Sequence, residues 1–412
     1  MASMQLSDKW FGRLVVPSLL MAGLAGCENG LPDSPWTIVQ PSRLERPGVV
    51  LFDPEARHAE LAAMDLRARA FLCGPPEEEW QSFKAIARPK APGSSKGKSA
   101  EPFAMEVMRA TAWAVATHDH GSIRAVVRVM DRWAKGEALT QVDETSNELY
   151  AVNRTVLPLI VSWSALKGEL ARDREKTARI ERWLADLMQL RRQMAPAPGK
   201  TTARNNHHYL NASVDMAWGA LTGNRSAFDL GVAAYMDALA AMRADGSLPL
   251  ETNRGARALW YQRHAIASLV TIAEIASVQG VDLYGREIEG RSLHTAVRFL
   301  IDAIQQPEMV LGYAAENHNP GTADEWWMQD LSFLATRGHG RHYMAWVEPY
   351  RTRFADRPEA RELSALLAAR DPDFQPAIDD YSGGNMSCFF ADPPARFAIS
   401  TVSAVQSQPD EG

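Results

Sequence analysis

The sequence predicts an all-α protein assembled from helical hairpins. Apolar residues recur at steps of three and four along most of the chain, as between Leu210 and Leu221, and this spacing places them on one face of a helix. Turn-forming pairs such as Gly223-Asn224 and Asp245-Gly246 separate the periodic segments. Strand signals are scarce before residues 387–397. Many paired helices of similar length are typical of an α/α toroid or an α-solenoid.

The expected helices follow one another with short breaks. No signature recurs at a fixed period, which argues against tetratricopeptide-type arrays. Residues 89–101 form a low-complexity basic loop between two of the helices. The expected helices cover residues 55–72, 77–88, 102–117, 121–139, 147–168, 173–193, 206–222, 225–243, 256–279, 290–305, 324–336, 340–353 and 358–369.

The first residues have the layout of a secretory signal. Lys9 and Arg13 precede the short apolar run 14–26, which ends in small residues before Cys27. The ending Leu-Ala-Gly-Cys looks like a bacterial lipobox, in which Cys27 is lipidated and becomes the first residue. A plain signal peptide with an incidental cysteine is the alternative. Glu28 rather than Asp follows Cys27, which favours an outer-membrane lipoprotein facing the periplasm.

These features predict four parts: a signal peptide over 1–26, a Pro-rich tether over 27–53, a helical domain over 54–390 and a tail over 391–412. No other run of about 20 apolar residues exists, so we expect membrane contact only through the lipid anchor. Two cysteines remain in the mature chain. Cys73 and Cys388 either pair in an oxidising compartment or stay separate buried thiols.

The composition is that of an ordinary soluble protein, with 46% apolar and 23% charged residues and a net charge of −6. The chain has no basic stripe of the kind that binds nucleic acid. An acidic protein that acts on an acidic polymer needs positive charge concentrated locally. Two short segments supply basic residues for this purpose: Arg204, His207, His208, Arg254, Arg257, Arg263 and His264.

Four residues have the chemistry for β-elimination on a uronic-acid polymer. Arg254 neutralises the uronate carboxylate, and the amide of Asn206 adds a donor. Tyr261 takes the C5 proton and protonates the leaving oxygen, since on a mannuronate both lie on the same side of the ring. His207 assists, or acts as the base for the other epimer. Arg254 and Tyr261 are seven residues apart, which is about two helical turns.

Each residue also has a structural interpretation. Asn206 suits a helix N-cap, His207 a helix-start surface position, Arg254 a solvated loop and Tyr261 a half-buried core. Adjacent histidines point to different sides of a helix, so a metal site is disfavoured, and we expect no cofactor. A glycoside hydrolase would instead use paired carboxylates. The acidic residues available for such a pair are Glu251, Asp324, Glu325 and Asp330.

The sequence around these four residues resembles the alginate (poly-β-D-mannuronate) lyases of polysaccharide lyase family five. The resemblance spans roughly residues 120 to 390. It implies an incomplete (α/α) toroid with a deep cleft, an acidic polysaccharide as substrate, and a carbon-oxygen lyase activity. The matching segments are Asn205-Asn206-His207-His208-Tyr209, Leu248-Pro249-Leu250-Glu251 with Arg254, Arg257-Ala258-Leu259-Trp260-Tyr261, Gly280-Val281-Asp282-Leu283, Met130–Leu139, Ala345–Phe354 and Ser382-Gly383-Gly384-Asn385. Further residues in or beside these segments are expected to bind substrate: Arg204, His208, Arg257, Trp260 and His264.

The chain departs from the family at positions that bear on the substrate. The family's N-terminal lid carries a Lys and a Tyr, whereas residues 49–60 have neither and the first tyrosine is Tyr150. Leu210 and His264 stand where the family has Trp and often Tyr. Another polyuronate, such as glucuronan or an exopolysaccharide, is therefore an alternative substrate. A non-catalytic polyuronate-binding or secretion lipoprotein is the second alternative, and the sequence leaves the oligomeric state open.

Overall fold

The structure is a computed structural model that describes residues 43–170, 173–317 and 324–393. Four helices that are apolar on nearly all sides form its inner layer. They pack side by side in chain order, α3 on α5, α5 on α7 and α7 on α10. These inner helices are α3 (Glu101–Thr117), α5 (Ser146–Leu166), α7 (Asn206–Thr222) and α10 (Ala258–Val278).

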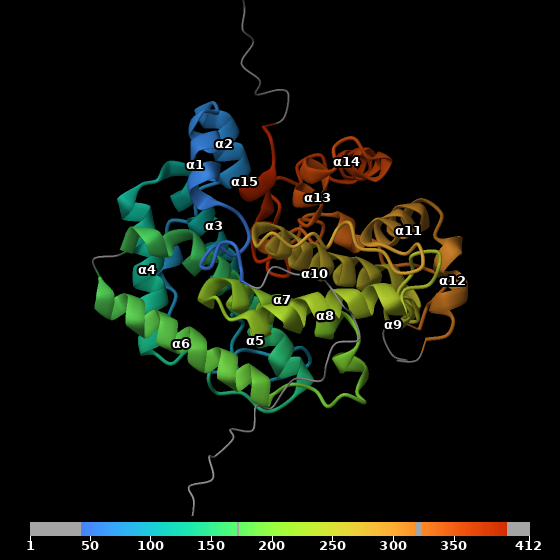
Figure 1. Cartoon of the computed structure of the whole chain (residues 1–412), viewed down its shortest axis with the longest axis horizontal. Coiled ribbons are helices and arrows are strands. Elements are labelled where there is room, and N and C mark those ends of the chain that lie inside the picture. The colour runs from blue at the N-terminus through green and yellow to red at the C-terminus, as the bar shows by residue number, and fades with distance from the viewer. Residues whose placement is uncertain (1–42, 171–172, 318–323, 394–412) are drawn as a thin grey trace, which may run out of the picture. The chain divides into compact units, whose positions relative to one another are not determined.

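A second layer of helices covers the inner one (Figure 1). α4 packs on α3, α6 on α4 and α5, α8 on α7 and α10, and α11 on α10. Short connections such as Gly223-Asn224 make consecutive helices antiparallel hairpins. The arrangement confirms the all-α class and the incomplete (α/α) toroid. The outer helices are α4 (His120–Lys135), α6 (Arg174–Gln193), α8 (Arg225–Ala241) and α11 (Leu293–Gln305).

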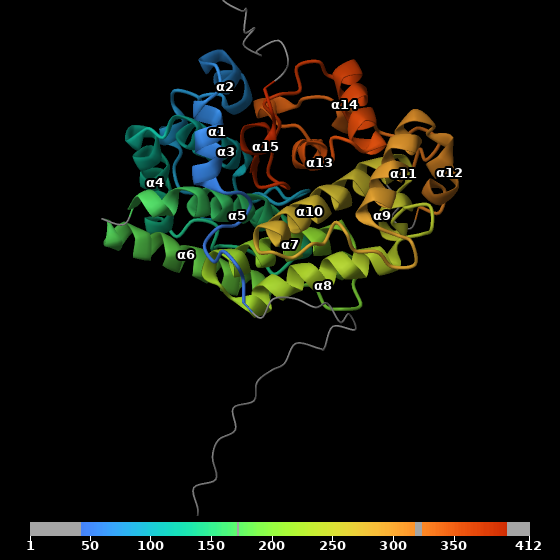
Figure 2. The same cartoon turned by 45° about the horizontal axis from the view of Figure 1, so that its top comes forward.

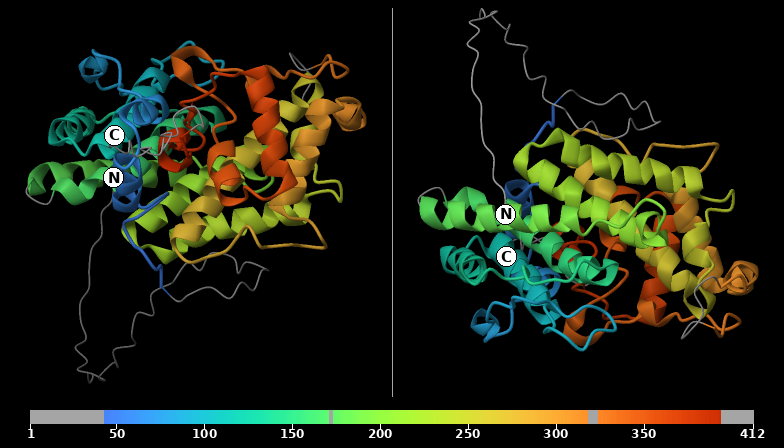
Figure 3. Two further views of the ribbon diagram at one scale, coloured as in Figure 1. Left: turned by 90° about the horizontal axis from the view of Figure 1, so that it is seen from above. Right: turned by 90° about the horizontal axis from the view of Figure 1, so that it is seen from below.

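Shorter helices close the two ends of the layers, and Figures 2 and 3 show them from three further directions. They are α1 (Pro54–Ala62), α2 (Leu66–Cys73), α9 (Pro249–Thr252), α12 (Glu308–Ala314), α13 (Val347–Arg353), α14 (Pro358–Arg370) and α15 (Met386–Phe390). Single 3-10 turns lie at η1 (Trp80–Ser82), η2 (Lys167–Leu170), η3 (Thr201–Ala203), η4 (Gly255–Arg257), η5 (Ser332–Leu334) and η6 (Gly338–Gly340).

A small β-hairpin near the end of the described chain packs against the inner helices α3 and α5. Its strands β1 (Ile378–Asp379) and β2 (Gly384–Asn385) are antiparallel, with Ile378 opposite Asn385. Gly383 adopts a φ of 83° in the connecting turn, a conformation that favours glycine. The carbonyl of Tyr381, at the tip, accepts a hydrogen bond of 3.4 Å from Thr271 of α10. The hairpin therefore delivers Tyr381 to the inner layer.

Three expected helices are wrong or much shorter than predicted. Residues 77–88 contain only η1, residues 324–336 only η5, and residues 340–353 only α13 and the end of η6. In the first of these segments the backbone groups bond other segments instead of forming a helix ladder: Leu139 N donates to Ile86 O at 2.9 Å and Gln141 N to Ala87 O at 3.0 Å. Long-range pairing has overridden the local pattern. The strand signal at residues 387–397 is also wrong where the structure describes it, because residues 387–390 belong to α15.

Part of the predicted tether belongs to the folded body. Val50 is fully buried, and its N–H donates to Ser164 at 3.0 Å. The amide of Gln279 donates to the carbonyls of Arg46 and Val49 at 3.0 and 2.7 Å. Residues 44–53 are therefore packed on α5 and α10. The predicted signal peptide, Cys27 and most of the predicted tail lie outside the described residues.

Among the described residues, the stretch Ser146–Glu169 is long and apolar enough to cross a membrane, but 72% of its most apolar window is buried in the fold. α5 packs against α3 and α7, which identifies it as a core helix of the toroid. The same burial explains why most of the surface of this inner helix is apolar.

Cys73 and Cys388 form a disulfide with a Cα–Cα distance of 4.5 Å, so the pairing that the sequence left open is settled. The bond joins α2 to α15 across 315 residues. It links the two ends of the described chain, which also meet through direct packing of α2 on α15 and through the hydrogen bonds from Asn385 Nδ2 to Leu72 O and Cys73 O.

Candidate active site

The start of α7 carries the first two site residues. The side chain of Asn205 accepts the N–H of His207 at 3.1 Å, so Asn205 is the N-cap and Asn206 is the first helical residue. The interpretation of Asn206 as the helix cap is therefore wrong, because Asn205 takes that role. The Asn206 side chain is fully buried, and its Oδ1 has no partner among the described residues. Asn206 thus keeps hydrogen-bonding capacity that the fold does not use.

Glu251 of α9 holds Asn206 in place. Its carboxylate accepts from Asn206 N at 2.6 Å and from Asn206 Nδ2 at 2.8 Å. Burial raises the pKa of Glu251 to about 7, against the lowering effect of the Asn206 hydrogen bonds and of Arg254. The two bonds tie the start of α7 to the segment that leads into Arg254, and they fix the orientation of the Asn206 amide.

Arg254 lies over the ring of Tyr261, with its guanidinium carbon 4.0 Å from the ring centroid. Gly255, with a φ of 57°, makes the turn between Arg254 and α10, a conformation that disfavours side chains with a Cβ. No carboxylate pairs with Arg254 within the described ranges, although it is only half-exposed. A guanidinium in this state is available to an anionic ligand.

A chain of aromatic contacts connects His207 with Tyr261. The His207 ring lies 4.7 Å from that of Tyr150, which lies 6.0 Å from that of His264. His264 in turn is 6.4 Å from Tyr261. The structure therefore brings Asn206, His207, Arg254 and Tyr261 to one place, from α7, from the turn after α9 and from α10.

The histidines do not supply the positive charge that the sequence suggested. Burial, followed by Arg254, lowers the pKa of His207 to about 4. Burial also lowers the pKa of His208, and it lowers the pKa of His264 well below the usual range. These rings are neutral at pH 7, so the positive field of the site comes from arginines.

Two arginines stand behind the site and are already neutralised. Arg341 is buried and donates to Asp379 at 3.0 Å, to Asp380 at 2.5 Å and to Glu101 at 3.1 Å. Arg154 donates to Asp380 at 2.9 Å. Both guanidinium groups lie over the ring of Tyr381, at 4.9 and 5.4 Å. The network fixes the hairpin tip against α5 and leaves Arg254 as the open cation.

The five expected substrate-binding residues lie in different environments. Arg204 and Arg257 are exposed, and Trp260 is half-buried against Phe333 and Tyr343. His264 is buried among rings, and neither ring nitrogen has a partner among the described residues. The carboxylates of Asp237 and Asp215 act on the pKa of His208, whereas Arg254 acts on that of His207, and the expected role of His208 in substrate binding stays a prediction.

The alternative chemistries find no support in the geometry. Glu251 is bound to Asn206, whereas Asp330 accepts from Ser332 in the exposed turn after residue 323. Asp324 accepts from Asn317 at 2.9 Å in the same turn. Glu251, Asp324 and Asp330 therefore each accept a hydrogen bond from a protein group. The described residues hold no group of three or more His, Cys, Asp or Glu side chains suited to a metal ion.

Sequence reasoning missed Tyr150, Arg154, Tyr381 and Arg341 as parts of the site. Tyr150 and Arg154 are four residues apart on α5, a spacing that places them on one face. The sequence signal that could have identified them is this polar face on α5, a helix that is otherwise apolar. Nothing local in the sequence indicates that residues 341 and 381 meet that face.

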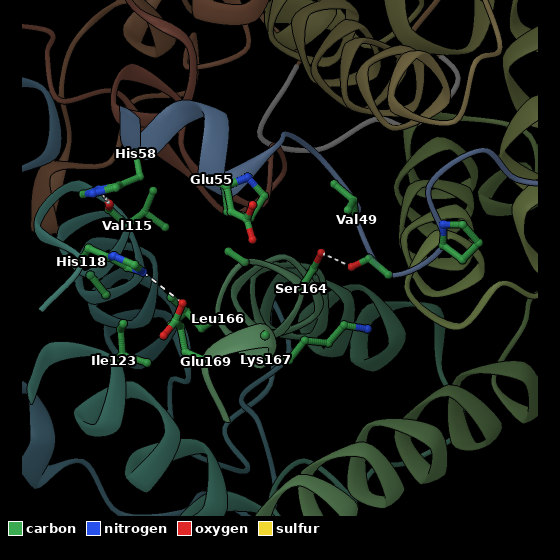
Figure 4. A pocket seen from close by; sticks show the side chains of 16 residues that line it. Val49, Glu55, His58, Val115, His118, Ile123, Ser164, Leu166, Lys167 and Glu169 are labelled. Carbon is green, nitrogen blue, oxygen red and sulfur yellow. Dashed lines mark hydrogen bonds and ion pairs between the residues drawn. The ribbon is translucent and has the colours of Figure 1, made fainter. Parts of the chain in front are cut away.

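A pocket lies far from this site (Figure 4). It has a volume of about 370 Å³ and lies beside the end of α5, near Ser164 and Lys167. Tyr150 is at the beginning of α5, about 24 Å away along the helix axis. His118 pairs with Glu169 at 3.0 Å, and His58 bonds Val115 O at 2.9 Å. These polar groups are satisfied by the protein itself.

Comparison with known proteins now identifies the family. The family model described as alginate lyase matches residues 90–310, more than half of the 412-residue chain. The chain belongs to the alginate lyase family. It is similar to a polysaccharide lyase of Stenotrophomonas maltophilia, 28% identical over 62% of this chain and 70% of that protein. It is also 31% identical to an alginate lyase of Pseudomonas fluorescens, over 47% of each chain.

Solved structures agree with the observed fold of this family member. The chain is similar to alginate lyase A1-III in a histidine-to-alanine variant complexed with a tetrasaccharide, with a TM-score of 0.68, 25% identity, and coverage of 86% of this chain and 98% of that one. The crystal structure of A1-III from Sphingomonas species A1 gives a TM-score of 0.67 at 25% identity, covering 85% of this chain and 98% of that one.

The raised pKa of Glu251 predicts a pH-dependent stability. The folded protein binds this proton more tightly than the unfolded chain does, so stability falls as the pH rises from the ordinary value near 4.5 to about 7. We expect the unfolding free energy of the unmodified protein, relative to Glu251→Gln, to fall by about 3 kcal/mol across this window. Urea unfolding of both proteins from pH 4.5 to 8 measures this. If the unfolding free energies of the two proteins changed in parallel with pH, Glu251 would not have the raised pKa that its burial gives.

The lowered pKa of His207 predicts a neutral imidazole over the whole physiological range. We expect its NMR signals to titrate with a midpoint near 4 rather than 6.5. The chain has 10 histidines, so His207→Gln serves to assign the signal by its disappearance. A midpoint of 6 or above would show that the ring is not desolvated beside Arg254.

Proposed function

We propose that this protein is a polysaccharide lyase that cleaves a β-1,4-linked polyuronate, with polymannuronate as the first choice, by β-elimination. The observation that carries the proposal is the Arg254 guanidinium, unpaired within the described residues and 4.0 Å from the Tyr261 ring centroid. The buried Asn206 amide is held beside them by Glu251. Membership of the alginate lyase family and the tetrasaccharide complex of A1-III support the same class of substrate.

The first step is neutralisation of the uronate carboxylate. Arg254 has the planar donor arrangement that suits a carboxylate. One N–H of Asn206 Nδ2 donates a hydrogen bond to Glu251, and the other N–H is left to donate to the substrate. These donors stabilise the negative charge that moves from C5 onto the carboxylate as the C5–H bond breaks.

The second step is proton transfer by Tyr261. The Tyr261 oxygen, on a ring that the Arg254 guanidinium overlies, takes the C5 proton. The electron pair of the C5–H bond forms the C4–C5 double bond, and the bond from C4 to the glycosidic oxygen breaks. The phenol then protonates that oxygen, which regenerates the phenolate. Neutral His207 contributes a hydrogen bond rather than a charge.

The substrate preference rests on the residues around this centre. His264 and Leu210 stand where the resemblance leads us to expect aromatic side chains. His264 has two ring nitrogens without a partner among the described residues, so it offers a hydrogen bond to a sugar hydroxyl. Glucuronan and related exopolysaccharides are therefore the alternative substrates.

Replacing Tyr261 or Arg254 tests the elimination directly. The unmodified protein is expected to raise the ultraviolet absorbance of a polyuronate solution, because the new double bond is conjugated with the carboxylate. Tyr261→Phe and Arg254→Ala are each expected to lower kcat by at least about 10²-fold. The substrates are polymannuronate, polyguluronate, glucuronan and hyaluronan, and the rates rank them.

A matched control exists within the chain. Arg243 also lies over a tyrosine ring, that of Tyr313, at 3.9 Å. Tyr313→Phe is expected to retain activity, since the Tyr313 hydroxyl bonds the exposed Asp245 rather than a residue of the site. A folded protein that releases no unsaturated product from any of the four polymers would overturn the lyase assignment. Saturated products would indicate hydrolysis, and binding without turnover a non-catalytic lipoprotein.

We propose further that the enzyme is an outer-membrane lipoprotein facing the periplasm, anchored through Cys27. The signal layout of residues 1–26 and the oxidised Cys73–Cys388 pair support this location. Expression of the full chain in a Gram-negative host, followed by fractionation, is expected to place it with the membranes and to release Cys27→Ala in soluble form. Equal distribution of the two proteins would contradict the anchor.

A further inference from the structure

Three consecutive apolar side chains are exposed in the turn after residue 323. Trp326, Trp327 and Met328 are 37%, 57% and 57% exposed. Only two other large apolar side chains of the described residues are exposed, Leu66 and Met309. The protein buries its other described tryptophans at least partly. An exposed indole pair is therefore unusual for this chain, and a contiguous apolar patch of this kind is typical of a binding surface.

The turn is held by specific hydrogen bonds. Gln329 Nε2 donates to Trp326 O at 3.1 Å and to Gly255 O at 3.1 Å, and Gln329 Oε1 accepts from Leu259 N at 3.2 Å. Asp330 N donates to Ala256 O at 2.7 Å. The tryptophans are thus presented by an ordered turn, so little conformational entropy is lost when a ligand binds to them.

These bonds place the turn beside the catalytic centre. Gln329 and Asp330 bond the backbone of Gly255, Ala256 and Leu259. These three residues lie between Arg254 and Tyr261 in the chain. Phe333, just beyond the turn, contacts Trp260 with ring centroids 5.9 Å apart. The exposed indoles are therefore attached to the same segment that carries the guanidinium and the phenol.

The two rings have the geometry and chemistry for sugars. Trp326 and Trp327 are 5.8 Å apart and nearly perpendicular, at 83°, so they offer two faces in different orientations. An indole face packs against the C–H face of a pyranose, and its N–H is a hydrogen-bond donor. Glu325 and Asp330 are acidic neighbours, so the contribution of the pair to binding an anionic polymer comes from stacking and not from charge.

We propose that Trp326 and Trp327 form a stacking subsite for the sugar units that flank the bond being cleaved. The inference rests on the proposed polyuronate lyase function and adds a preference for the length of the substrate. Both residues lie outside the segment 90–310 that matches the family model. The subsite gives this chain a preference for longer polyuronates, because only these reach both the catalytic centre and the indoles.

The test compares the Trp326→Ala/Trp327→Ala double variant with the unmodified protein on mannuronate oligomers of increasing length. We expect KM for the long oligomers to rise roughly tenfold while kcat stays within about twofold, which is the pattern of lost ground-state binding. The shortest cleaved oligomers should show no change. The rise should persist at high salt, since stacking is not screened. Leu66→Ala, an exposed apolar residue on α2, is the matched control.

The outcomes separate the two proposals. Unchanged KM at every length, in an active double variant, overturns the subsite and leaves the lyase function intact. An equal loss at all lengths also overturns it, because that pattern indicates damage to the catalytic centre. If the unmodified protein cleaves nothing, indole fluorescence with polymannuronate decides the subsite. A change that disappears in the double variant supports it, and no change overturns it together with the lyase function.

Discussion

The paired hydrogen bonds between Asn206 and Glu251 are the contact on which the site depends. α9 has four residues, too few to be stable alone. It is held by Glu251 on the α7 side, while Leu248 N donates to Gln262 of α10 at 2.9 Å on the other. Arg254 lies two residues after the end of α9, and Gly255 turns the chain toward α10, which carries Tyr261. The segment that carries Arg254 is thus short and is held between two inner helices.

Charge is distributed so that the cation beside Tyr261 stays without a carboxylate partner among the described residues. Arg341 is matched by carboxylates, and Arg263 is fully buried within an aromatic cage, with its guanidinium carbon 4.6 Å from the Tyr343 ring centroid. Burial keeps the histidines neutral. Arg254 has neither a carboxylate partner within the described residues nor complete burial. A protein with a net charge of −6 can in this way attract a carboxylate locally.

The sequence predicted what local patterns determine. Apolar spacing defined α7 and α10. The expectation that Arg254 and Tyr261 share one helical face was wrong, because Arg254 precedes α10 and the turn at Gly255 brings the two side chains together. The apolar spacing failed at residues 77–88 and 324–336, because their backbone groups bond distant segments, as Asp330 does with Ala256. Tyr150 and Tyr381 were missed for the same reason. They belong to the site through contacts between residues far apart in the chain, such as the 6.0 Å approach of their rings, and no local signal encodes these contacts.

Two buried side chains of the site keep polar atoms that have no partner among the described residues. Asn206 Oδ1 and both ring nitrogens of His264 are unsatisfied among the described residues, although both side chains are buried. Each such atom costs the folded state about 1–3 kcal/mol. Glu251, by contrast, accepts two hydrogen bonds from Asn206, which makes it a positioning residue, and burial raises its pKa. A fold that leaves hydrogen-bonding capacity open beside an uncompensated guanidinium is arranged for a polar, anionic ligand, and a sugar acid supplies both the carboxylate and the hydroxyls that satisfy these atoms.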